Sequence, residues 1–186
     1  MDWILKIDNQ ILDWVAEHLH SPLGDAVMPV ITVLGNAGAI WILVAVILLF
    51  LPKWREAGIQ MLAAMAVAAI VGSLILKPLI ARERPFSANE FTELLISAPK
   101  DFSFPSGHTS ASIAAAVILL MRNRWVGIPA MILAVLIAFS RIYLYVHYPS
   151  DILGGIILCL LSAIAVRTAA LWIKKKWVSK QNVNNL

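Results

Sequence analysis

Long runs of apolar residues constrain this 186-residue chain more than any other feature of its sequence. A helix that crosses a bilayer needs about 20 apolar residues, because each residue adds about 1.5 Å to its length. Four segments are close to that length, at residues 58–79, 106–121, 125–146 and 151–173. Since 60% of all residues are hydrophobic, a soluble domain is excluded. The sequence therefore predicts an all-α fold, a polytopic bundle of membrane helices.

A fifth crossing is predicted ahead of these four. Residues 23–51 are mostly apolar but exceed the length that one span requires, and "GNAG" at residues 35–38 interrupts them. Paired glycines of this kind favour a break or hinge. We count the segment as one broken crossing, and the alternative of two separate helices stays open. The prediction is thus about five transmembrane helices.

The N-terminal segment has a different pattern. Residues 1–20 repeat an apolar residue every three or four positions, with acidic residues on the opposite face. The apolar stripe consists of Ile4, Ile7, Ile11, Val15 and Leu19. This amphipathic helix could lie in the membrane interface or pack as a cap on the bundle. We divide the chain into an N-terminal interfacial helix (1–22), a membrane domain (23–173) and a basic tail (174–186).

Charge is distributed unequally between the two sides that five crossings would create. One side holds a single acidic residue, Glu56, and nine basic residues, whereas the other side holds six basic and ten acidic residues. The nine are Lys53, Arg55, Arg122, Arg124, Arg167, Lys174, Lys175, Lys176 and Lys180. Because cytoplasmic loops are enriched in Lys and Arg, we expect a cytoplasmic C-terminus in a multi-pass protein of the cytoplasmic membrane.

The same rule places the N-terminus, the loop 80–103 and the short loop 147–150 on the outer side. The net charge of +4 then reflects membrane anchoring, so we expect the lipid bilayer as a partner and no nucleic acid. The single cysteine, Cys159, lies in an apolar run without a second cysteine to pair with. A disulfide framework is therefore excluded.

Unusual polar residues gather at the predicted outer face. They come from five separate pieces of sequence: Lys77, then Arg82 and Arg84, then Ser106, Gly107 and His108, then Arg141, then His147 and Asp151. Arg141 lies about 24 Å along its predicted helix, at the depth of the outer leaflet. An arginine at that depth needs an anionic partner.

Each piece also has a structural explanation when taken alone. Lys77 could be a lysine that extends to the interface, and "PSGH" at residues 105–108 could be a capped helix entry. We interpret Arg82, next to Glu83, as a solvated loop charge. All of these residues at one depth of one face, however, favour a functional site.

Three cations around one site favour a multiply charged anion, and the planar fork of arginine suits phosphate oxygens. Two histidines can divide the chemistry, since one imidazole can attack phosphorus while the other protonates the departing oxygen. Asp151 lies one helical turn after His147, near enough to orient its ring. A zinc site at His108, His147 and Asp151 is disfavoured because three nearby cations would repel the ion.

These residues fit three sequence motifs. "KPLIARERP" matches K-x6-R-P, "PSGH" matches the second motif, and "SRIYLYVHYPSD" matches S-R-x5-H-x3-D. In this the chain resembles the type 2 phosphatidic acid phosphatase (PAP2) superfamily of membrane lipid phosphatases, which is related to vanadium haloperoxidases. The resemblance spans residues 77–151, with the motifs in the order found in the family.

The resemblance implies a role for each motif residue. His147 would be the nucleophile that forms a phosphohistidine, Asp151 its orienting base, and His108 the group that protonates the leaving group and later activates water. The phosphate would be bound by Lys77, Arg84, Ser106, Gly107 and Arg141. The family requires no metal or other cofactor.

The resemblance also implies a lipid phosphate or diphosphate as substrate, with undecaprenyl diphosphate first. Some dedicated undecaprenyl-diphosphate phosphatases carry Asp where Gly107 stands, so phosphatidylglycerophosphate and phosphatidate stay open. A lipid phosphotransferase that uses the same site, and a non-catalytic transporter or scaffold, are the remaining alternatives. The sequence leaves the oligomeric state unknown.

Overall fold

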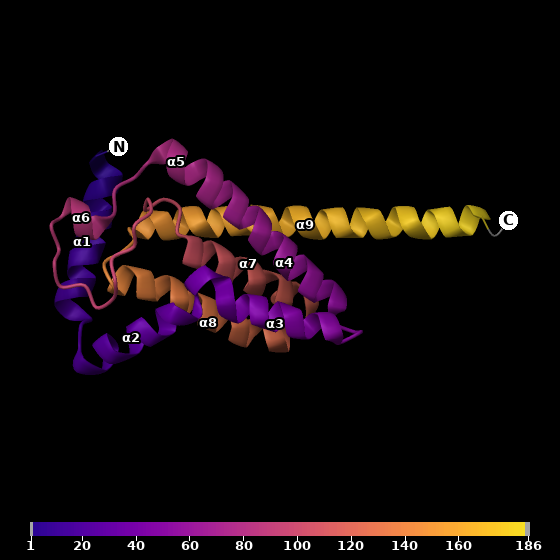
Figure 1. Cartoon of the computed structure of the whole chain (residues 1–186), viewed down its shortest axis with the longest axis horizontal. Helices are drawn as coiled ribbons and strands as arrows, with labels where there is room; N and C mark the ends of the chain where they lie inside the picture. The colour runs from indigo at the N-terminus through magenta and orange to yellow at the C-terminus, as the bar shows by residue number, and fades with distance from the viewer. Residues whose placement is uncertain (1, 185–186) are drawn as a thin grey trace.

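The computed structural model describes residues 2–184, and these residues form helices and loops without a strand (Figure 1). The helices are α1 (Asp2–His18), α2 (Pro22–Leu34), η1 (Asn36–Gly38), α3 (Ala39–Phe50), α4 (Arg55–Ala69), η2 (Ile70–Leu76), α5 (Lys77–Ile80), α6 (Pro85–Ala88), α7 (Gly107–Arg122), α8 (Arg124–Tyr143) and α9 (Pro149–Asn184). The predicted all-α fold is confirmed.

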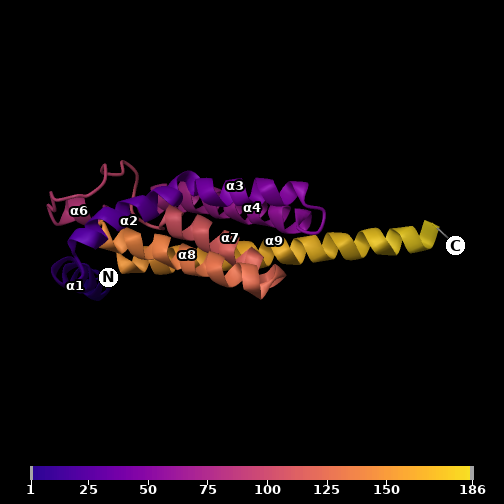
Figure 2. The same cartoon turned by 90° about the horizontal axis from the view of Figure 1, so that it is seen from below.

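Helix α7 forms the centre of the bundle. It packs against α8, α4 and α9, and both side views show it enclosed by these helices (Figures 1 and 2). Ala114, Ala115 and Ala116 are fully buried on it. Because alanine side chains are short, they let neighbouring helices approach α7 closely. The functional motif at the start of α7 is thus held by the best-packed helix of the molecule.

Three segments are long and apolar enough to cross a membrane, namely Arg55–Ala88, Arg124–Tyr143 and Pro149–Trp177, and the bent pair of α2 with η1–α3 would make a fourth. These helices expose large apolar side chains such as Leu74, Val135 and Leu161, as a lipid-facing surface requires. The chain is therefore a multi-pass membrane protein. Helix α7 has 16 residues, which rise only about 24 Å, so the number of five complete crossings stays a prediction.

The predicted break at residues 35–38 is confirmed. Helix α2 ends at Leu34, and the next segment turns by 45° relative to it. Ala37 has φ 50° and Gly38 has φ 68°, a left-handed conformation that costs an alanine free energy but suits glycine. The break places Asn36 next to α7, and a single broken crossing stays a prediction for this segment.

Helix α8 ends earlier than predicted. The apolar pattern extends to residue 146, but the structure ends the helix at Tyr143. Tyr145 adopts φ 56° and turns the chain back, so that the backbone N–H groups of Val146 and His147 both donate to the carbonyl of Arg141 at 3.2 Å. The predicted end of the helix is wrong because this turn consists of apolar and aromatic residues and contains no Gly or Pro, the residues that usually mark the end of a helix in a sequence.

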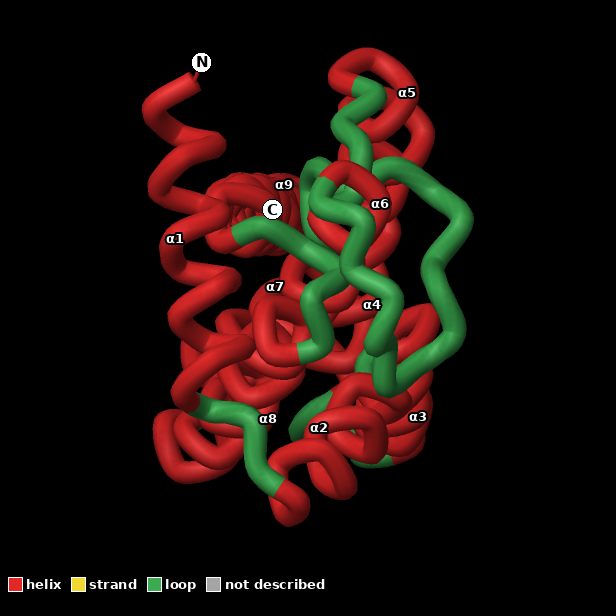
Figure 3. Tube along the Cα trace, turned by 90° about the vertical axis from the view of Figure 1, so that its left-hand side faces the viewer, coloured by secondary structure: helices red, strands yellow, loops and turns green. Residues whose placement is uncertain are grey.

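Helix α1 lies across the end of α8 and α9 (Figure 3). Leu12 and Val15 are buried against the bundle, whereas Trp3, Ile7 and Trp14 are exposed. The expected helix is confirmed and packs on the bundle. Its exposed apolar residues are compatible with the membrane interface, and that position stays a prediction. At the other terminus, α9 continues through the segment predicted as a tail; residues 185 and 186 lie outside the described residues.

The far end of the bundle carries several of the nine basic residues that the sequence assigns to one side. There Arg122 donates to the carbonyl of Lys53 at 2.5 Å, and Lys174 lies 3.9 Å from Glu56. Helices α1 and α6, together with the long loop before α7, all lie at the opposite end (Figures 1 and 3). The two sets of loops that the sequence places on opposite sides therefore lie at opposite ends of the bundle, and which end faces the cytoplasm stays a prediction.

Candidate functional site

A cavity of about 490 Å³ opens at the end of the bundle that carries α1 and the loops. Its lining brings together side chains from five separate segments. They are Lys77, Arg84, His108, Arg141 and His147, with Gly107, Asn36, Thr32 and Asp101 beside them. Each cation and each histidine that the sequence singles out, apart from Arg82, thus lines one cavity.

Lys77 reaches the cavity through an irregular helix. Between α4 and α5 the backbone forms η2, a π-helix, which is a feature frequent at functional sites. The extra residue per turn rotates the following residues, and the Lys77 side chain becomes buried while its neighbours Leu79 and Ile80 stay exposed. The Lys77 ammonium donates to the Asp101 carboxylate and, at 2.8 Å, to the carbonyl of Phe102.

Arg84 is buried and uses its whole guanidinium fork. Its Nε and Nη2 donate to the backbone carbonyl and to the carboxylate of Asp101, both at 2.7 Å. Its Nη1 donates to the carbonyl of Val146 at 2.7 Å and lies 3.2 Å from Nε2 of His147. These bonds fix Arg84 against the histidine that the resemblance names as nucleophile.

Arg141 is the cation with the fewest partners. It is 3% exposed, and its Nη1 donates to the Thr32 hydroxyl of α2 at 2.6 Å. Among the described residues no carboxylate pairs with it, and its Nε is the one buried side-chain nitrogen or oxygen without a hydrogen-bond partner. A buried guanidinium in this state requires an anion to complete it. The cavity that Arg141 lines is where that anion can bind.

His147 is held in one orientation by its neighbours. Its Nε2 lies 3.2 Å from an Arg84 nitrogen, which can only donate, so Nε2 must be the unprotonated acceptor. The ring proton is then on Nδ1, which lies 3.4 Å from Oδ2 of Asp151. Burial lowers the pKa of His147 to about 3, and Arg84 and Arg141 act in the same direction. His147 is therefore neutral at physiological pH, with its free electron pair on the side of the cations.

Asp151 lies directly behind His147 and is fully buried. Its Oδ2 also accepts from the Ser103 hydroxyl at 2.5 Å and from the Tyr148 backbone N–H at 2.9 Å. Its Oδ1 accepts from Arg82 at 2.7 Å. The interpretation of Arg82 as a solvated loop charge is therefore wrong, because its guanidinium is paired with a buried carboxylate. In the sequence Arg82 is adjacent to Glu83, and this neighbouring charge suggested a solvated loop instead of a buried ion pair.

The start of α7 presents His108 to the cavity. Nε2 of His108 lies 2.9 Å from Oδ1 of Asn36, in the broken segment. Gly107 lines the cavity too, and a Cβ at this position would meet nothing within 4 Å. Ser106 instead caps α7, with its hydroxyl accepting from the Thr109 backbone N–H at 3.4 Å and from the Thr109 hydroxyl at 2.9 Å, and it is not among the residues that line the cavity. Its contact with phosphate stays a prediction.

Asp101 is a site residue that the sequence did not reveal. Its carboxylate bridges Lys77 and Arg84, yet the side chain remains 59% exposed. Partial burial raises the pKa of Asp101, but the hydrogen bond and charge of Lys77, together with Arg84, outweigh burial and lower that pKa to about 2. Two of the three cations thus share one carboxylate, whose single negative charge offsets only one of their two positive charges.

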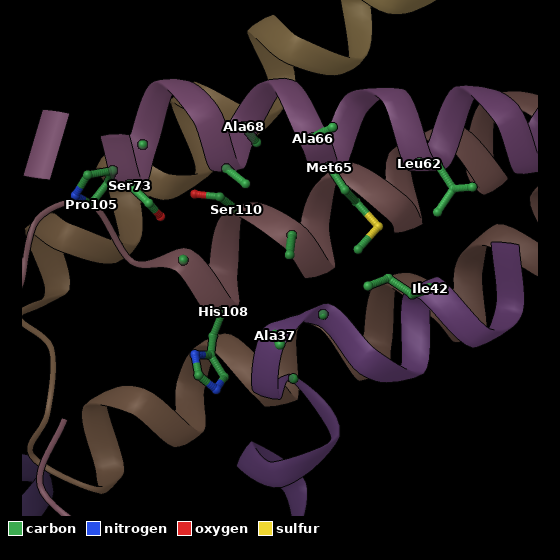
Figure 4. Close-up of a pocket in the computed structure, with 16 residues that line it drawn as sticks. Ala37, Ile42, Leu62, Met65, Ala66, Ala68, Ser73, Pro105, His108 and Ser110 are labelled. Carbon is green, nitrogen blue, oxygen red and sulfur yellow. The ribbon is translucent and has the colours of Figure 1, made fainter. Parts of the chain in front are cut away.

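A second cavity of about 550 Å³ adjoins the first, and the two share Ser73, Gly107 and His108. Figure 4 shows His108 toward one end of this second cavity and Leu62 and Ile42 toward the other. Its remaining walls are mainly apolar and come from α4, the η1–α3 segment and α7. A polar cavity and an apolar cavity therefore meet at His108.

A family model described as the PAP2 superfamily matches residues 57–175. The chain belongs to the PAP2 superfamily. The match includes Lys77, Arg84, His108, His147 and Asp151 but ends short of α1, α2 and α3 on the N-terminal side. The resemblance seen in the three motifs is thereby confirmed.

Individual PAP2 relatives agree with this assignment. The chain is 37% identical over 117 residues to an undecaprenyl-diphosphatase of Sulfolobus acidocaldarius, covering 62% of this chain and 56% of that protein. It is 32% identical over 146 residues to the undecaprenyl-diphosphatase BcrC of Bacillus subtilis, covering 76% of this chain and 72% of the relative. The chain thus spans little more than half the length of the first relative.

Two solved structures share the fold of this chain. A transmembrane PAP2 type phosphatidylglycerolphosphate phosphatase from Bacillus subtilis superposes with a TM-score of 0.75 at 28% identity, over 93% of this chain and 89% of that one. The LpxE protein of Aquifex aeolicus gives a TM-score of 0.74 at 22% identity, over 86% of this chain and 93% of its own. At that identity the second likeness shows the fold alone.

Proposed function

We propose that this PAP2 protein is a metal-independent phosphatase that hydrolyses a lipid phosphate or diphosphate, with undecaprenyl diphosphate as its substrate. The observation that carries the proposal is the buried guanidinium of Arg141, which lines the cavity without a carboxylate partner among the described residues. A phosphate group that also contacts Lys77 and Arg84 would complete it, because guanidinium forks bind phosphate oxygens in pairs.

The arrangement of the histidines supports a phosphohistidine route. Nε2 of His147 attacks phosphorus, while Nδ1–H donates to Asp151 and stabilises the developing charge on the ring. The bond from phosphorus to the leaving oxygen breaks, and His108 supplies the proton that this oxygen takes up. His108 then removes a proton from water, which attacks the phosphohistidine, releases inorganic phosphate and restores His147.

The apolar cavity supports a lipid as substrate. It joins the polar cavity at His108, next to which the leaving group departs. Hydrocarbon is favoured there because burying apolar surface releases about 25 cal/mol per Å². The charge difference between the two ends of the bundle supports an active site at the outer face of the cytoplasmic membrane, with α9 ending in the cytoplasm.

Phosphatidylglycerophosphate is a second candidate substrate. It is favoured by the likeness to the Bacillus subtilis phosphatidylglycerolphosphate phosphatase, which extends over 93% of this chain. It is also favoured by Gly107, which leaves open space in the cavity for a headgroup.

Phosphate release from the detergent-purified protein tests the proposal. Undecaprenyl diphosphate, phosphatidylglycerophosphate and phosphatidate are offered side by side in the presence of EDTA, with H147N as the matched inactive variant. A kcat/KM clearly higher for the prenyl diphosphate supports the proposed substrate, and equal values indicate a broad lipid phosphatase. No release by the wild type without an added acceptor refutes hydrolysis and leaves phosphate transfer to an acceptor as the next assay.

A further inference from the structure

Helix α1 carries an acidic residue that is buried at the catalytic end of the bundle. Asp8 is only 2% exposed, which is rare for an aspartate unless it is paired. Its Oδ1 accepts from the Ser150 backbone N–H at 2.9 Å, and its Oδ2 accepts from the Ser150 hydroxyl at 2.5 Å and from Arg82 at 2.7 Å. Asp8 therefore binds the segment that opens α9, one residue before Asp151.

Arg82 connects Asp8 to the catalytic carboxylate. Its Nη2 binds Asp8, while its Nη1 donates to Oδ1 of Asp151 and to the Ser150 hydroxyl, both at 2.7 Å. The guanidinium also stacks over the Tyr148 ring, 3.9 Å from its centroid. Only a planar fork can bind two carboxylates on different helices while stacking on an aromatic ring, so a lysine cannot replace it.

We propose that Asp8 and Arg82 are positioning residues for the proposed phosphatase reaction, holding Asp151, and through it His147, in the reactive orientation. The inference rests on the proposed function, because it assumes that His147 is the nucleophile. It gives α1 a part in catalysis although this helix lies outside residues 57–175, which carry the family match.

The contacts around Asp151 explain why such support is needed. A carboxylate that accepts from four groups must be fixed on both oxygens, and Arg82 is the donor that fixes Oδ1. Without Arg82 the carboxylate can rotate away from His147, whose Nδ1 is its longest contact at 3.4 Å. A displacement of about 1 Å in a reacting group can reduce the rate on the order of 10²-fold.

Charge gives the pair a second measurable signature. The groups that face His147 are Asp151 on α9, Arg84 and Asp101 from the loops, Lys77 on α5, Arg141 on α8 and His108 on α7. Without the positive charge of Arg82, the negative charge of Asp151 acts more strongly on the His147 ring. The protonated ring is then favoured, so the pKa of His147 should rise. In R82Q the acidic limb of the profile of kcat against pH should therefore move to higher pH. Loss of the Asp8 charge acts in the opposite direction, so the limb should move to lower pH in D8N.

The test compares kcat, KM and thermal unfolding of the full-length wild type with those of D8N, R82Q, R82K and the double variant D8N/R82Q. The matched control is D13N, because Asp13 lies on the same helix and accepts from the Tyr145 hydroxyl at 2.8 Å without contact to Arg82. We expect kcat to fall by on the order of 10²-fold in R82Q and about tenfold in D8N, with KM unchanged. R82K should stay close to R82Q, and the double variant should be no slower than R82Q.

Several results would overturn the inference. Wild-type kcat in R82Q or D8N would do so, as would recovery of kcat in R82K. Equal losses in D13N and D8N, matched by a fall in Tm, would mean that α1 is needed only for folding. If R82Q does not fold, the variant S150A is measured instead. We expect S150A to have a lower kcat than the wild type at an unchanged Tm. A wild-type kcat in S150A would contradict a positioning role for the contacts of Asp8, Arg82 and Ser150. Failure of the proposed function looks different, since the wild type itself would then release no phosphate.

Discussion

Replacement of Asp151 by asparagine should reduce turnover far more than it reduces stability. The Asp151 carboxylate accepts from Ser103, Tyr148 and His147 on Oδ2 and from Arg82 on Oδ1. Asparagine has the same shape but one oxygen and one NH₂ group, and every neighbour of the carboxylate is a donor. In either orientation the new NH₂ group faces a donor, so at least one side of the network is lost.

The expected loss follows from the role of Asp151 toward His147. An amide in place of the carboxylate can stabilise the wrong ring tautomer, and the comparable change in a catalytic triad lowers kcat by about 10⁴-fold. That corresponds to about 5.4 kcal/mol of transition-state stabilisation, at 1.36 kcal/mol for each factor of ten. The folded state should lose only about 1–3 kcal/mol, the cost of one unsatisfied buried polar group.

Phosphate release in detergent, with EDTA, and thermal unfolding of the same samples measure the two effects. Asp25→Asn is the control, because Asp25 also accepts a hydroxyl hydrogen bond, from Tyr143 at 2.6 Å, but takes no part in the hydrogen bonds of His147. The double variant H147N/D151N should be no slower than H147N, since the two residues act as a unit. A D151N protein with kcat within tenfold of the wild type and an unchanged Tm would refute the proposed orientation of His147.

Three further predictions concern the cavity. Asp101→Asn should tighten inhibition by inorganic phosphate about tenfold, because a competing charge-assisted hydrogen bond worth about 1.5 kcal/mol is removed; unchanged or weaker inhibition would contradict this role for Asp101. Gly107→Asp should fold with an unchanged Tm, since its Cβ meets nothing within 4 Å. Because some undecaprenyl-diphosphate phosphatases carry Asp at this position, the variant should raise KM for phosphatidylglycerophosphate through charge repulsion more than KM for undecaprenyl diphosphate, and equal changes in the two KM values would contradict this. The pKa of His147 is about 3 in the folded state, against 6.5 for a free histidine. Below pH 6.5 the unfolded chain therefore binds more protons than the folded one, and the free energy of unfolding should fall from pH 6.5 toward pH 4. This window lies above the pH range in which Asp101 titrates. In H147N, Tm should depend less on pH between pH 6.5 and pH 4. An equally steep dependence would mean that a group other than His147 causes the loss of stability.

The sequence predicts the helices and the cations of the site because each follows from a local rule. Apolar length locates the crossings, and the depth of Arg141 along its helix marks it as a residue that needs an anion. Lys77, His108 and His147 are predicted as site residues because each lies at a helix end on the same predicted side of the membrane. The burial of His147, by contrast, is not visible in its loop sequence, because it results from the left-handed turn at Tyr145.

The residues that sequence reasoning missed share a physical cause. Arg82 contacts partners 69 and 74 residues away in the chain, and Asp101 reaches back 24 residues to Lys77. No helical periodicity links such positions, and a charge in a loop has no pattern that distinguishes a buried ion pair from a solvated one. Asp8, on the polar face of an amphipathic helix, carries the same ambiguity until the helix is docked.

The shared wall of the two cavities has a consequence for the products of bond cleavage. Ser73, Gly107 and His108 line both spaces, so in the proposed reaction the bond that breaks would lie at the border between a polar cavity and an apolar one. Each product of the proposed reaction would then form next to the phase that dissolves it: inorganic phosphate would have a short path to water, and the dephosphorylated lipid a short path to the bilayer. Departure in two directions keeps the products apart, and the reverse reaction would require both to return at once.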